Sequence, residues 1–345
     1  MKCFFIGGTK RGYLTLKALV ESGAEVMGVI SLRQDEHETE RFETAIQQLS
    51  EEFHISHYET KWLKDADYAK LIRDSGADMA LVVGCRVLIA KEVYEAAPLG
   101  TLAVHDSMLP EYRGFAPLNW AILNGEDHTG VTLFFLNELM DGGDIVAQRE
   151  VPISPTDTAP EVYSRVCDAT VEIVLEAYPA LAAGSIRRVQ QDYSVGSFTC
   201  SRTPADGLID WHRSSREIFD QIRALTSPYP GAFTYYQSRK LTIWSASLEK
   251  NPPLYRGRIP GRVVAVSKAQ GHADVLTGDG MIRILQVQAE GENRTSAANV
   301  IHSVRDFLGL RLEELLQRIR LLEAGGTTTD PSRATSAEPP KKIGS

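Results

Sequence analysis

Two loops hold the side chains whose types and spacing favour chemistry. His105 ends a strand-like run and is followed at once by a loop that proline and glycine punctuate, over residues 106–114. Asp141 stands in a second loop, directly before two glycines. A carboxylate near an imidazole raises the imidazole pKa and fixes the orientation of the ring. Such a pair can do acid–base work or stabilise an oxyanion, although a single histidine is more often structural.

The elements that must position these residues alternate between strand-like and helix-like patterns over the first 200 residues. Apolar runs predict strands over 3–6, 26–30 and 79–84 and a strand ending at His105, and amphipathic runs predict helices over 13–20 and 65–75. This order predicts an α/β fold with a Rossmann-like parallel sheet covered by helices. The loops after Ile6, Val83 and Val104 should leave the same edge of the sheet, where ligands bind in such folds.

The loop after the first expected strand is rich in glycine. Residues 7–12 read Gly-Gly-Thr-Lys-Arg-Gly, which does not match G-x-G-x-x-G, and Ser31-Leu32-Arg33 follows the second strand where an acidic residue would be needed. A dinucleotide-dependent redox enzyme is therefore disfavoured. The loop could still hold a phosphate through backbone N–H groups, or it could be a tight turn without a ligand.

The pattern changes after residue 200. A turn cluster over 203–207 precedes a helix over 215–225, which Ser215 and Ile218 would start, and prolines break the chain at 228–230. Short alternating runs then predict a small β-rich, OB-like barrel with strands over 233–236, 241–246, 261–266, 273–276 and 281–287. Helices over 296–304 and 310–323 would close it. We therefore expect a catalytic domain over 1–200, a barrel domain over 201–323 and a disordered tail over 324–345.

Composition narrows the class of protein. Hydrophobic residues make up 43% and charged residues 24% of the chain, the net charge is −8, and the four cysteines and eight histidines show no metal-ligand spacing. No signal peptide and no apolar run of roughly 20 residues are apparent. The sequence predicts a reduced cytoplasmic protein without a metal or a membrane span, and its acidity disfavours a polyanionic partner.

Several dense motifs resemble the folate-dependent formyltransferase family. They are H-x-S-x-L-P-x-x-R-G from His105, A-P-L-N-W-A-I-L-N-G-E, T-G-V-T-L, and D-G-G-D-I-V-A-Q from Asp141. That family includes methionyl-tRNA formyltransferase and the sugar N-formyltransferases. D-G-L-I-D-W and R-A-L-T-S-P-Y-P-G-A resemble the carboxyl-terminal domain of the methionyl-tRNA and aminoarabinose members. The resemblance implies 10-formyltetrahydrofolate as co-substrate and an amine as acceptor.

The resemblance also implies residue roles. His105 would stabilise the oxyanion, and Asp141 would hold His105 charged and help to remove the amine proton. The pterin pocket would be lined by Gly84, Cys85, Arg86, Val87, Leu88, Leu139, Met140 and Asp144. Substrate contacts are expected from Gly8, Thr9, Lys10, Arg11, Ser107 and Arg113. The position of the first loop is the reason to expect nucleotide phosphates at Thr9, Lys10 and Arg11.

One position departs from the family pattern. Many members carry asparagine two residues before the histidine as a second oxyanion donor, and this chain has Ala103. Asn119, Asn124 or water would have to replace that donor. The hydrolase domain of formyltetrahydrofolate dehydrogenase also lacks it, so hydrolysis to formate and a non-catalytic folate-binding role stay open. Asp106 beside His105 is also unusual and could shift the His105 pKa.

The charge of the segment after the second strand indicates which kind of amine accepts the formyl group. The tRNA-specific members carry a basic insertion after the second strand, whereas residues 33–43 of this chain are strongly acidic. A small amine, most plausibly an amino sugar linked to a nucleotide, is therefore favoured over tRNA. The carboxyl-terminal domain could be the interface of a homodimer, a substrate-binding module, or both.

Overall fold

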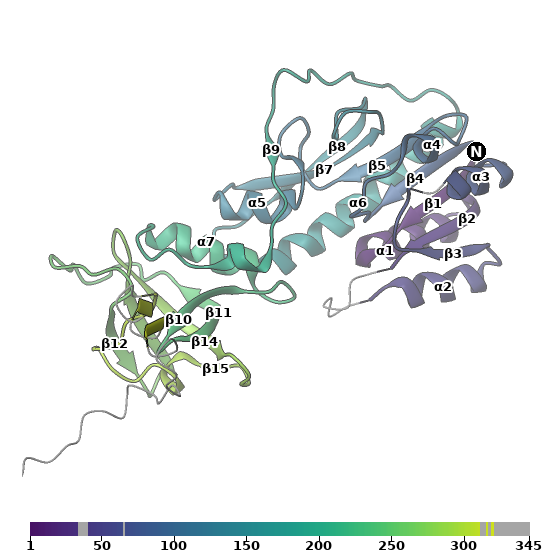
Figure 1. Ribbon diagram of the computed structural model, residues 1–345. Coiled ribbons are helices and arrows are strands. Elements are labelled where there is room, and N and C mark those ends of the chain that lie inside the picture. Colours follow the sequence, from purple (N-terminus) through teal and green to yellow (C-terminus); the bar gives the residue numbers. More distant parts are fainter. Residues whose placement is uncertain (34–40, 65, 311–314, 317–318, 321–345) are drawn as a thin grey trace, which may run out of the picture.

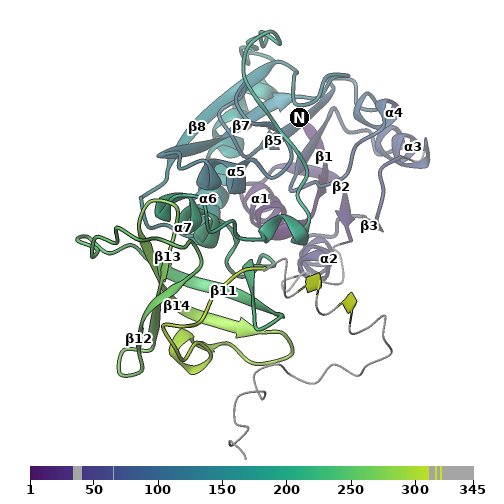
Figure 2. The same cartoon turned by 60° about the vertical axis from the view of Figure 1, so that its left-hand side comes forward.

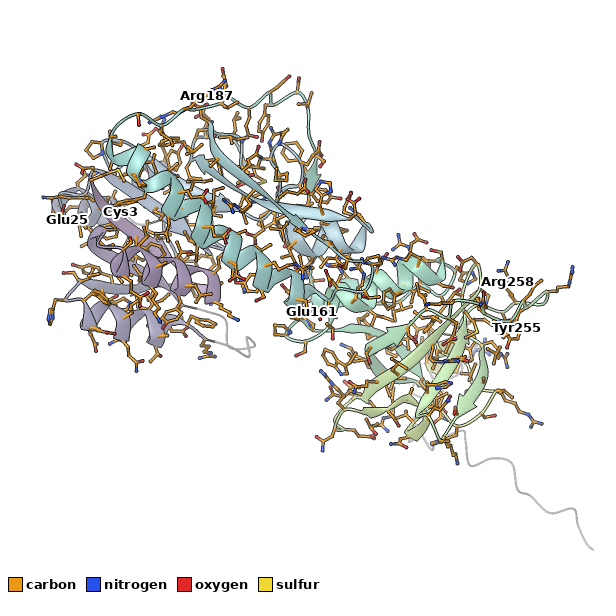
Figure 3. The ribbon with its side chains drawn as sticks, turned by 180° about the vertical axis from the view of Figure 1, so that it is seen from behind. Cys3, Glu25, Glu161, Arg187, Tyr255 and Arg258 are labelled. Atoms are coloured by element: carbon orange, nitrogen blue, oxygen red, sulfur yellow. The ribbon has the colours of Figure 1, made fainter. Side chains whose placement is uncertain are left out.

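The computed structural model describes residues 1–33, 41–64, 66–310, 315–316 and 319–320. An α/β unit is followed by a smaller β-rich unit, and a long connection leaves the end of α6 and returns along the α/β unit before α7 (Figure 1). In Figure 3, Glu161 lies at the end of α6 near the β-rich unit and Arg187 lies on the connection near the other end of α6. The domain boundaries at 200 and 323 remain a proposal.

A seven-stranded sheet forms the centre of the α/β unit, in the order β3-β2-β1-β4-β5-β7-β8. The first five strands are parallel, as predicted, and β7 and β8 add an antiparallel edge. All five residues of β4 are buried, because helices cover both faces of a parallel sheet. The strands span β1 Lys2–Gly7, β2 Glu25–Leu32, β3 His57–Thr60, β4 Met79–Val83, β5 Thr101–His105, β7 His128–Phe135 and β8 Ile145–Pro152.

The helix α6 begins where local sequence satisfies free N–H groups. At the start of α6, Thr158 and Glu161 form a capping box in which the Thr158 N–H donates to Glu161 Oε2 at 2.7 Å. The helix α6 packs along α1 and β8 and was not among the predicted elements. The helices span α1 Thr9–Glu21, α2 Glu43–Glu52, α3 Ala66–Asp74, α4 Lys91–Tyr94, α5 Pro117–Leu123 and α6 Ala159–Ala182.

The topology brings three loops to one edge of the sheet. The strands β1, β4 and β5 are neighbours and parallel, so the loops after Gly7, Val83 and His105 leave the sheet at their shared carboxyl end. The predicted common edge is therefore confirmed. A short two-stranded pair, β6 Arg113–Gly114 with β9 Phe198–Thr199, ties the loop after His105 to the connection between the two units.

In the β-rich unit, the helix α7 spans Ser215–Leu225, as predicted. Its first turn differs from the prediction, because Ser214 and not Ser215 is the N-cap residue. The Ser214 hydroxyl accepts the Glu217 N–H at 3.2 Å, and the Glu217 carboxylate accepts the Ser214 N–H at 2.9 Å. A 3-10 turn over Pro204–Gly207 precedes this helix, where the sequence predicted a turn cluster.

The strands of this unit confirm the five predicted runs and pair antiparallel in the order β10-β11-β14-β13-β12, with β15 beside β14. Figure 2 shows this unit below the α/β unit. The predicted helix over 296–304 is wrong: only a 3-10 turn forms, over Ala297–Asn299. The expected helix over 310–323 lies largely outside the described residues, and the tail over 324–345 lies entirely outside them. The strands span β10 Ala232–Tyr236, β11 Arg239–Ser247, β12 Val263–Ser267, β13 His272–Leu276, β14 Met281–Ala289 and β15 Thr295–Ser296.

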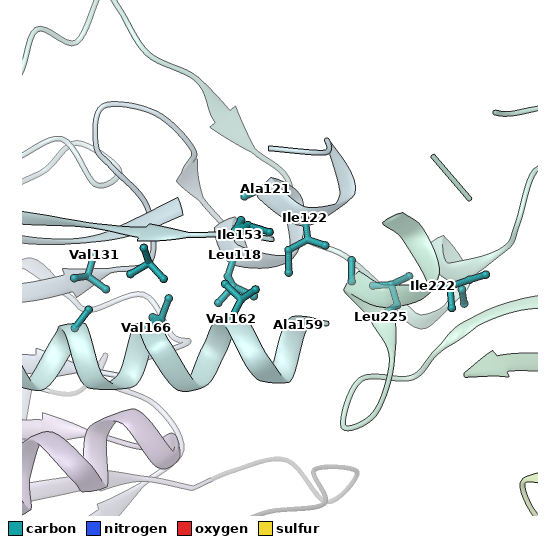
Figure 4. Packing of buried hydrophobic residues seen from close by; sticks show 14 of the residues in the cluster. Leu118, Ala121, Ile122, Val131, Ile153, Ala159, Val162, Val166, Ile222 and Leu225 are labelled. Atoms are coloured by element: carbon teal, nitrogen blue, oxygen red, sulfur yellow. The ribbon is translucent and has the colours of Figure 1, made fainter. Parts of the chain in front are cut away.

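The two units share one buried apolar cluster, which continues from α5 and α6 into α7. Polar contacts cross the same junction: Asn119 Nδ2 donates to the Ala224 carbonyl at 2.8 Å, and Arg223 Nη1 donates to the Asp157 carbonyl at 2.7 Å. The position of α7 relative to the sheet is therefore set by packing as well as by the connection. Figure 4 shows the apolar side chains at this junction, among them Leu118, Ile122, Ala159, Val162, Ile222 and Leu225.

Candidate active site

His105 is the last residue of β5, and its side chain is buried. Its Nε2 atom lies 2.8 Å from the backbone carbonyl oxygen of Tyr112. A carbonyl can only accept a hydrogen bond, so Nε2 carries a proton. In the neutral ring, Nδ1 is then bare, and it faces Asp141 Oδ2 at 3.7 Å. That separation is too long for a direct hydrogen bond but short enough for a strong electrostatic interaction.

Asp141 lies in the loop between β7 and β8. Its φ angle is +48°, a left-handed conformation that a residue other than glycine adopts at a cost. Its Oδ2 atom, which faces the imidazole, also accepts the Gly114 N–H at 2.8 Å, so the β6 backbone holds the carboxylate. The structure thus brings together the two residues that the sequence analysis selected as catalytic.

The pKa of the His105 imidazole lies below its usual value of 6.5, chiefly because burial disfavours the charged ring. The Asp141 carboxylate and the hydrogen bond to Tyr112 raise this pKa, and the Arg11 guanidinium lowers it further. The expectation that Asp141 would hold His105 charged is therefore not met. Burial outweighs the carboxylate, and the ring is neutral near pH 7.

Arg11 and Asp106 form a buried ion pair beside this site, with side chains 10% and 15% exposed. Burial lowers the pKa of Arg11, since the interior disfavours its charge. Asp106, which the sequence suggested could shift the His105 pKa, pairs with Arg11, and the Arg11 charge is one that lowers this pKa. The Arg11 charge is thus already balanced, and a phosphate would have to compete with Asp106 for it.

The other residues of the first loop differ in exposure. Thr9 has a φ angle of +61° and is buried, whereas the Lys10 side chain is exposed. The Thr9 hydroxyl accepts a long hydrogen bond from Tyr163 at 3.4 Å. A Cβ atom at Gly8 would lie 3.2 Å from the Leu32 carbonyl, so the backbone is closely packed here. Among Gly8, Thr9, Lys10 and Arg11, only Lys10 presents an exposed charge.

The two segments expected to bind pterin expose apolar side chains. After β4, Gly84 has a φ angle of +71°, and a Cβ atom there would lie 2.4 Å from the Gly8 carbonyl. Leu88 is 67% exposed, and Leu139 and Met140 are each 41% exposed. Exposed apolar side chains on two loops suit the face of a planar ring. The Arg86 side chain is exposed, and the Val87 and Asp144 side chains are half-buried.

Cys85 does not present a reactive thiol. Its Sγ atom donates to the Val87 carbonyl at 3.3 Å, and burial raises its pKa to about 11. The thiol is therefore protonated near pH 7, which leaves its backbone as the group available to a ligand.

Ser107 and Arg113 make internal contacts. The Ser107 hydroxyl donates to the Glu111 carbonyl at 2.6 Å, which closes the turn after His105. Arg113 is fully buried; its Nη2 atom donates to Gln191 Oε1 at 2.9 Å and its Nη1 atom to the Val195 carbonyl at 3.0 Å. Their expected contact with substrate stays a prediction, and the contacts they make shape the loop.

No side chain takes the place of the family's asparagine among the candidates that the sequence offered. Ala103 is buried in the core on one face of the sheet. The Asn119 amide donates to the Ala224 carbonyl, and the Asn124 amide donates to the Tyr112 hydroxyl at 3.1 Å. Both amides therefore have partners elsewhere.

Two residues that sequence reasoning missed complete the site. Tyr112 accepts the His105 Nε2 proton through its carbonyl, and Gln191 donates to the carbonyl oxygens of Asp141 and Gly143, both at 2.8 Å. Tyr112 lies within the motif that begins at His105, so attention to backbone acceptors could have found it. Gln191 had no such signal, because its partner is 50 residues away along the chain.

A cavity of about 390 Å³ lies beside the loop after His105. Tyr112 belongs to both the His105 site and this cavity, because its carbonyl accepts from His105 and its side chain borders the cavity. The Tyr112 hydroxyl donates to Glu126 Oε1 at 2.6 Å, and burial and this bond raise its pKa to about 12. The cavity is lined by Glu111, Tyr112, Trp120, Asn124, Glu126, Ser197, Phe198, Thr199 and Cys200.

Two other features are absent from the described part of the chain. No helix there is both long enough and apolar enough to cross a membrane. No group of three or more His, Cys, Asp or Glu side chains in those residues is arranged to hold a metal ion.

Comparisons with known proteins give the same assignment along most of the chain. Residues 1–178 match the family model described as formyl transferase, and residues 202–305 match that of the formyl transferase carboxyl-terminal domain. Curated relatives include the methionyl-tRNA formyltransferase of Symbiobacterium thermophilum, 32% identical over 90% of this chain and 95% of the relative. The enzyme of the same name from Pelotomaculum thermopropionicum is 32% identical over 91% of this chain and 99% of the relative.

Solved structures share the fold at lower identity. One is the N-formyltransferase of Helicobacter canadensis in complex with folinic acid and dTDP-3-aminofucose, with a TM-score of 0.62, 18% identity and coverage of 84% of this chain and 99% of that one. Another is HypX of Aquifex aeolicus in complex with tetrahydrofolic acid, with a TM-score of 0.60, 20% identity and coverage of 90% of this chain. This chain spans only 51% of HypX. With both family models matched in order, the chain belongs to the formyl transferase family.

Proposed function

We propose that this formyltransferase moves the formyl group of 10-formyltetrahydrofolate to the amine of a small acceptor, with His105 and Asp141 at the reacting centre. The observation that supports this most strongly is the buried His105–Asp141 pair. The ring is fixed by the Tyr112 carbonyl at 2.8 Å and presents bare Nδ1 toward a carboxylate 3.7 Å away. A neutral imidazole held in this way is a proton acceptor.

The folate supplies a formyl carbon that is already electrophilic, because it is bound to nitrogen. As the amine nitrogen bonds to that carbon, His105 Nδ1 takes the proton that the amine loses. Asp141 stabilises the imidazolium that results. The Nδ1–H of His105 can then donate a hydrogen bond to the formyl oxygen, which carries the negative charge. When the bond between the formyl carbon and the folate nitrogen breaks, the same proton passes to that nitrogen. No proton is gained or lost overall.

The folate contacts are proposed for the segments 84–88 and 139–144. The exposed apolar side chains of Leu88, Leu139 and Met140 would pack on the pterin ring, and backbone groups of these loops would bind its polar edge. Solved structures of the same fold carry tetrahydrofolic acid or folinic acid.

For the acceptor, we propose an amino sugar linked to a nucleotide. Residues 1–200 hold 17 Lys and Arg against 30 Asp and Glu, so the unit with the reacting residues repels a polyanion. Residues 33–43, on which this inference also rests, are acidic in sequence and lie mostly outside the described residues. The fold is shared with a structure that holds dTDP-3-aminofucose.

Methionyl-tRNA is the second candidate acceptor, and two observations favour it. Both curated relatives described above are methionyl-tRNA formyltransferases at 32% identity over most of the chain. In addition, residues 201–310 hold 14 Lys and Arg against 10 Asp and Glu, so the second unit is weakly basic. Phosphate contacts from that unit would be compatible with an acidic first unit.

The experiment is a panel of acceptors. Purified protein is incubated with 10-formyltetrahydrofolate and either nucleotide-linked amino sugars or methionyl-tRNA, and tetrahydrofolate release is followed together with the acceptor mass. A gain of one formyl group on an amino sugar supports the proposal, and a gain on methionyl-tRNA alone supports the second candidate. Equal release without any acceptor would identify a hydrolase. No release, with folate still bound, would identify a non-catalytic homologue.

A further inference from the structure

Gln191 is the exception in an exposed segment. Residues 187–190 and 194–196 of the connection between α6 and β9 are exposed, whereas Gln191 is only 9% exposed. A buried amide must satisfy its hydrogen-bonding groups, because an unpaired buried donor or acceptor destabilises the fold. Its partners therefore show why the chain turns this side chain inward.

The amide of Gln191 joins two parts of the site. Its Oε1 atom accepts from Arg113 Nη2 at 2.9 Å and, more weakly, from Arg113 Nε at 3.3 Å. Its Nε2 atom donates to the Asp141 carbonyl and to the Gly143 carbonyl, both at 2.8 Å. Both hydrogens of the NH₂ group and the carbonyl oxygen are thus used. Through them, Gln191 connects Arg113 to the loop that holds Asp141.

Arg113 makes this support rigid. It is fully buried, and its guanidinium lies over the Tyr193 ring at 4.3 Å and near the Phe198 ring at 5.6 Å. The residue after it, Gly114, donates its N–H to Asp141 Oδ2 at 2.8 Å. The same short strand therefore holds the Asp141 side chain directly and the Asp141 backbone through Gln191.

Asp141 needs such support because of its backbone conformation. Its φ of +48° is unfavourable for a residue with a side chain, and it persists only where surrounding contacts fix it. A second contact from the same segment acts nearby, since the Tyr193 hydroxyl donates to the Met140 carbonyl at 3.2 Å. Without the Gln191 amide, the Asp141 and Gly143 carbonyls would lose their donors.

We propose that Gln191 is a positioning residue, which holds the Asp141 carboxylate at its working distance from His105 through the Asp141 and Gly143 carbonyls. This inference rests on the proposed function for its meaning in catalysis. Its physical content, the placement of one carboxylate, does not depend on the identity of the acceptor.

The His105 imidazole reports that placement. The charged groups that act on it are Asp141, which raises its pKa, and Arg11, which lowers it, while Asp106 neutralises Arg11. If Asp141 moves away, its favourable interaction with the imidazolium weakens, and the His105 pKa must fall. A substitution that merely reduced global stability would not move this pKa in the folded state.

The test is an NMR titration of the His105 ring in the free protein. Gln191→Met keeps the length and removes both hydrogen-bonding groups without adding charge. Gln191→Asn keeps an amide but is one methylene shorter, and it serves if the Met variant does not fold. Val195→Ala, at a side chain 52% exposed in the same segment, is the matched control because the Val195 carbonyl still accepts from Arg113.

We expect the Gln191 variants to lower the His105 pKa by at least half of the shift that Asp141→Asn causes, and Val195→Ala to leave it unchanged. Introduced into Asp141→Asn, the Gln191 change should have no further effect. An unchanged His105 pKa in a folded Gln191 variant would overturn the proposal, as would a shift of equal size in the Asp141→Asn background. The titration needs no substrate, so an inactive enzyme and a misplaced Asp141 are distinguishable.

Discussion

At the scale of single residues, the site depends on a balance between burial and charge around one imidazole. Burial keeps His105 neutral, and the Tyr112 carbonyl determines which ring nitrogen carries the proton. Asp141 Oδ2 lies 3.7 Å from Nδ1, where it can stabilise the positive charge that forms on the ring during reaction. A ring that was permanently charged could not accept the amine proton. The lowered pKa therefore suits a proton carrier better than a fixed cation.

The Arg11–Asp106 pair should tune this balance in opposite directions. Asp106→Asn leaves the Arg11 charge unbalanced and should lower the His105 pKa further, whereas Arg11→Met leaves a carboxylate nearby and should raise it. Each change breaks a buried pair and should cost about 3–5 kcal/mol of stability. NMR titration of His105 and urea unfolding measure the two effects. Shifts of the same sign in both variants would contradict the assignment.

The buried neutral His105 also links stability to pH. Its folded pKa is below the unfolded value of 6.5, so between these two values the unfolded chain binds a proton that the folded chain does not. The stability contribution is complete above pH 6.5 and is lost as the pH falls through the folded pKa. In urea unfolding, His105→Gln should therefore lose less stability than the unchanged protein between pH 7 and pH 5. Parallel pH profiles would show that the imidazole is not the linked group.

At the scale of secondary structure, the capping box formed by Ser214 and Glu217 fixes where α7 begins. Ser214→Ala removes the hydroxyl that accepts the Glu217 N–H and should cost about 1 kcal/mol in urea unfolding. Glu217→Gln is the matched control, because glutamine can still accept from the Ser214 N–H and complete the capping box. A loss as large in the control as in Ser214→Ala would assign the effect to charge rather than to the cap.

The strands β1, β2, β4 and β5, the five longer strands of the second unit and the edge where the site lies could be predicted from sequence, because short apolar runs between turns carry a local signal. The strands β3, β7 and β8 were not predicted. The N-cap of α7 was placed one residue late, since Ser214 and Ser215 are adjacent and only the Glu217 partner distinguishes them. The long helix α6 was overlooked, although Thr158 and Glu161 mark its start.

Long-range contacts explain what the sequence could not predict about the site. His105 and Asp141 were found because each stands in a recognisable loop. The direction of the His105 pKa shift depends on burial, which only the folded chain sets, and on Arg11, which comes from the first turn of α1, almost 100 residues earlier. Arg113 was expected to contact substrate. In the structure it binds Gln191, and nothing in the sequence indicated this contact because the two residues are 78 positions apart.

At the scale of the whole molecule, charge is divided between the two units. The first 200 residues are strongly acidic and residues 201–310 are weakly basic, while a shared apolar cluster joins the units through α5, α6 and α7. An acceptor that reaches His105 therefore approaches a unit of net negative charge. This charge is one reason for proposing an acceptor with few phosphates.

Salt dependence of acceptor binding tests that expectation. With a nucleotide-linked amino sugar, raising salt from 50 to 200 mM should change the acceptor KM by less than about tenfold, because few counterions are released. A polyanion that made 6–10 phosphate contacts would lose about 10³–10⁵ in affinity over the same range. The folate KM measured in the same series is the internal control. A steep dependence for the acceptor alone would favour tRNA.

The most direct test follows the formyl carbon itself. Enzyme is mixed with 10-formyltetrahydrofolate that carries ¹³C in the formyl group, together with the acceptor panel, and ¹³C NMR records where the label goes in the unchanged protein and in His105→Gln and Asp141→Asn. We predict that the label appears as an N-formyl amide of the acceptor, at a rate at least a hundredfold lower in either variant. Label that appeared as formate without acceptor, or transfer at an undiminished rate in both variants, would contradict the account.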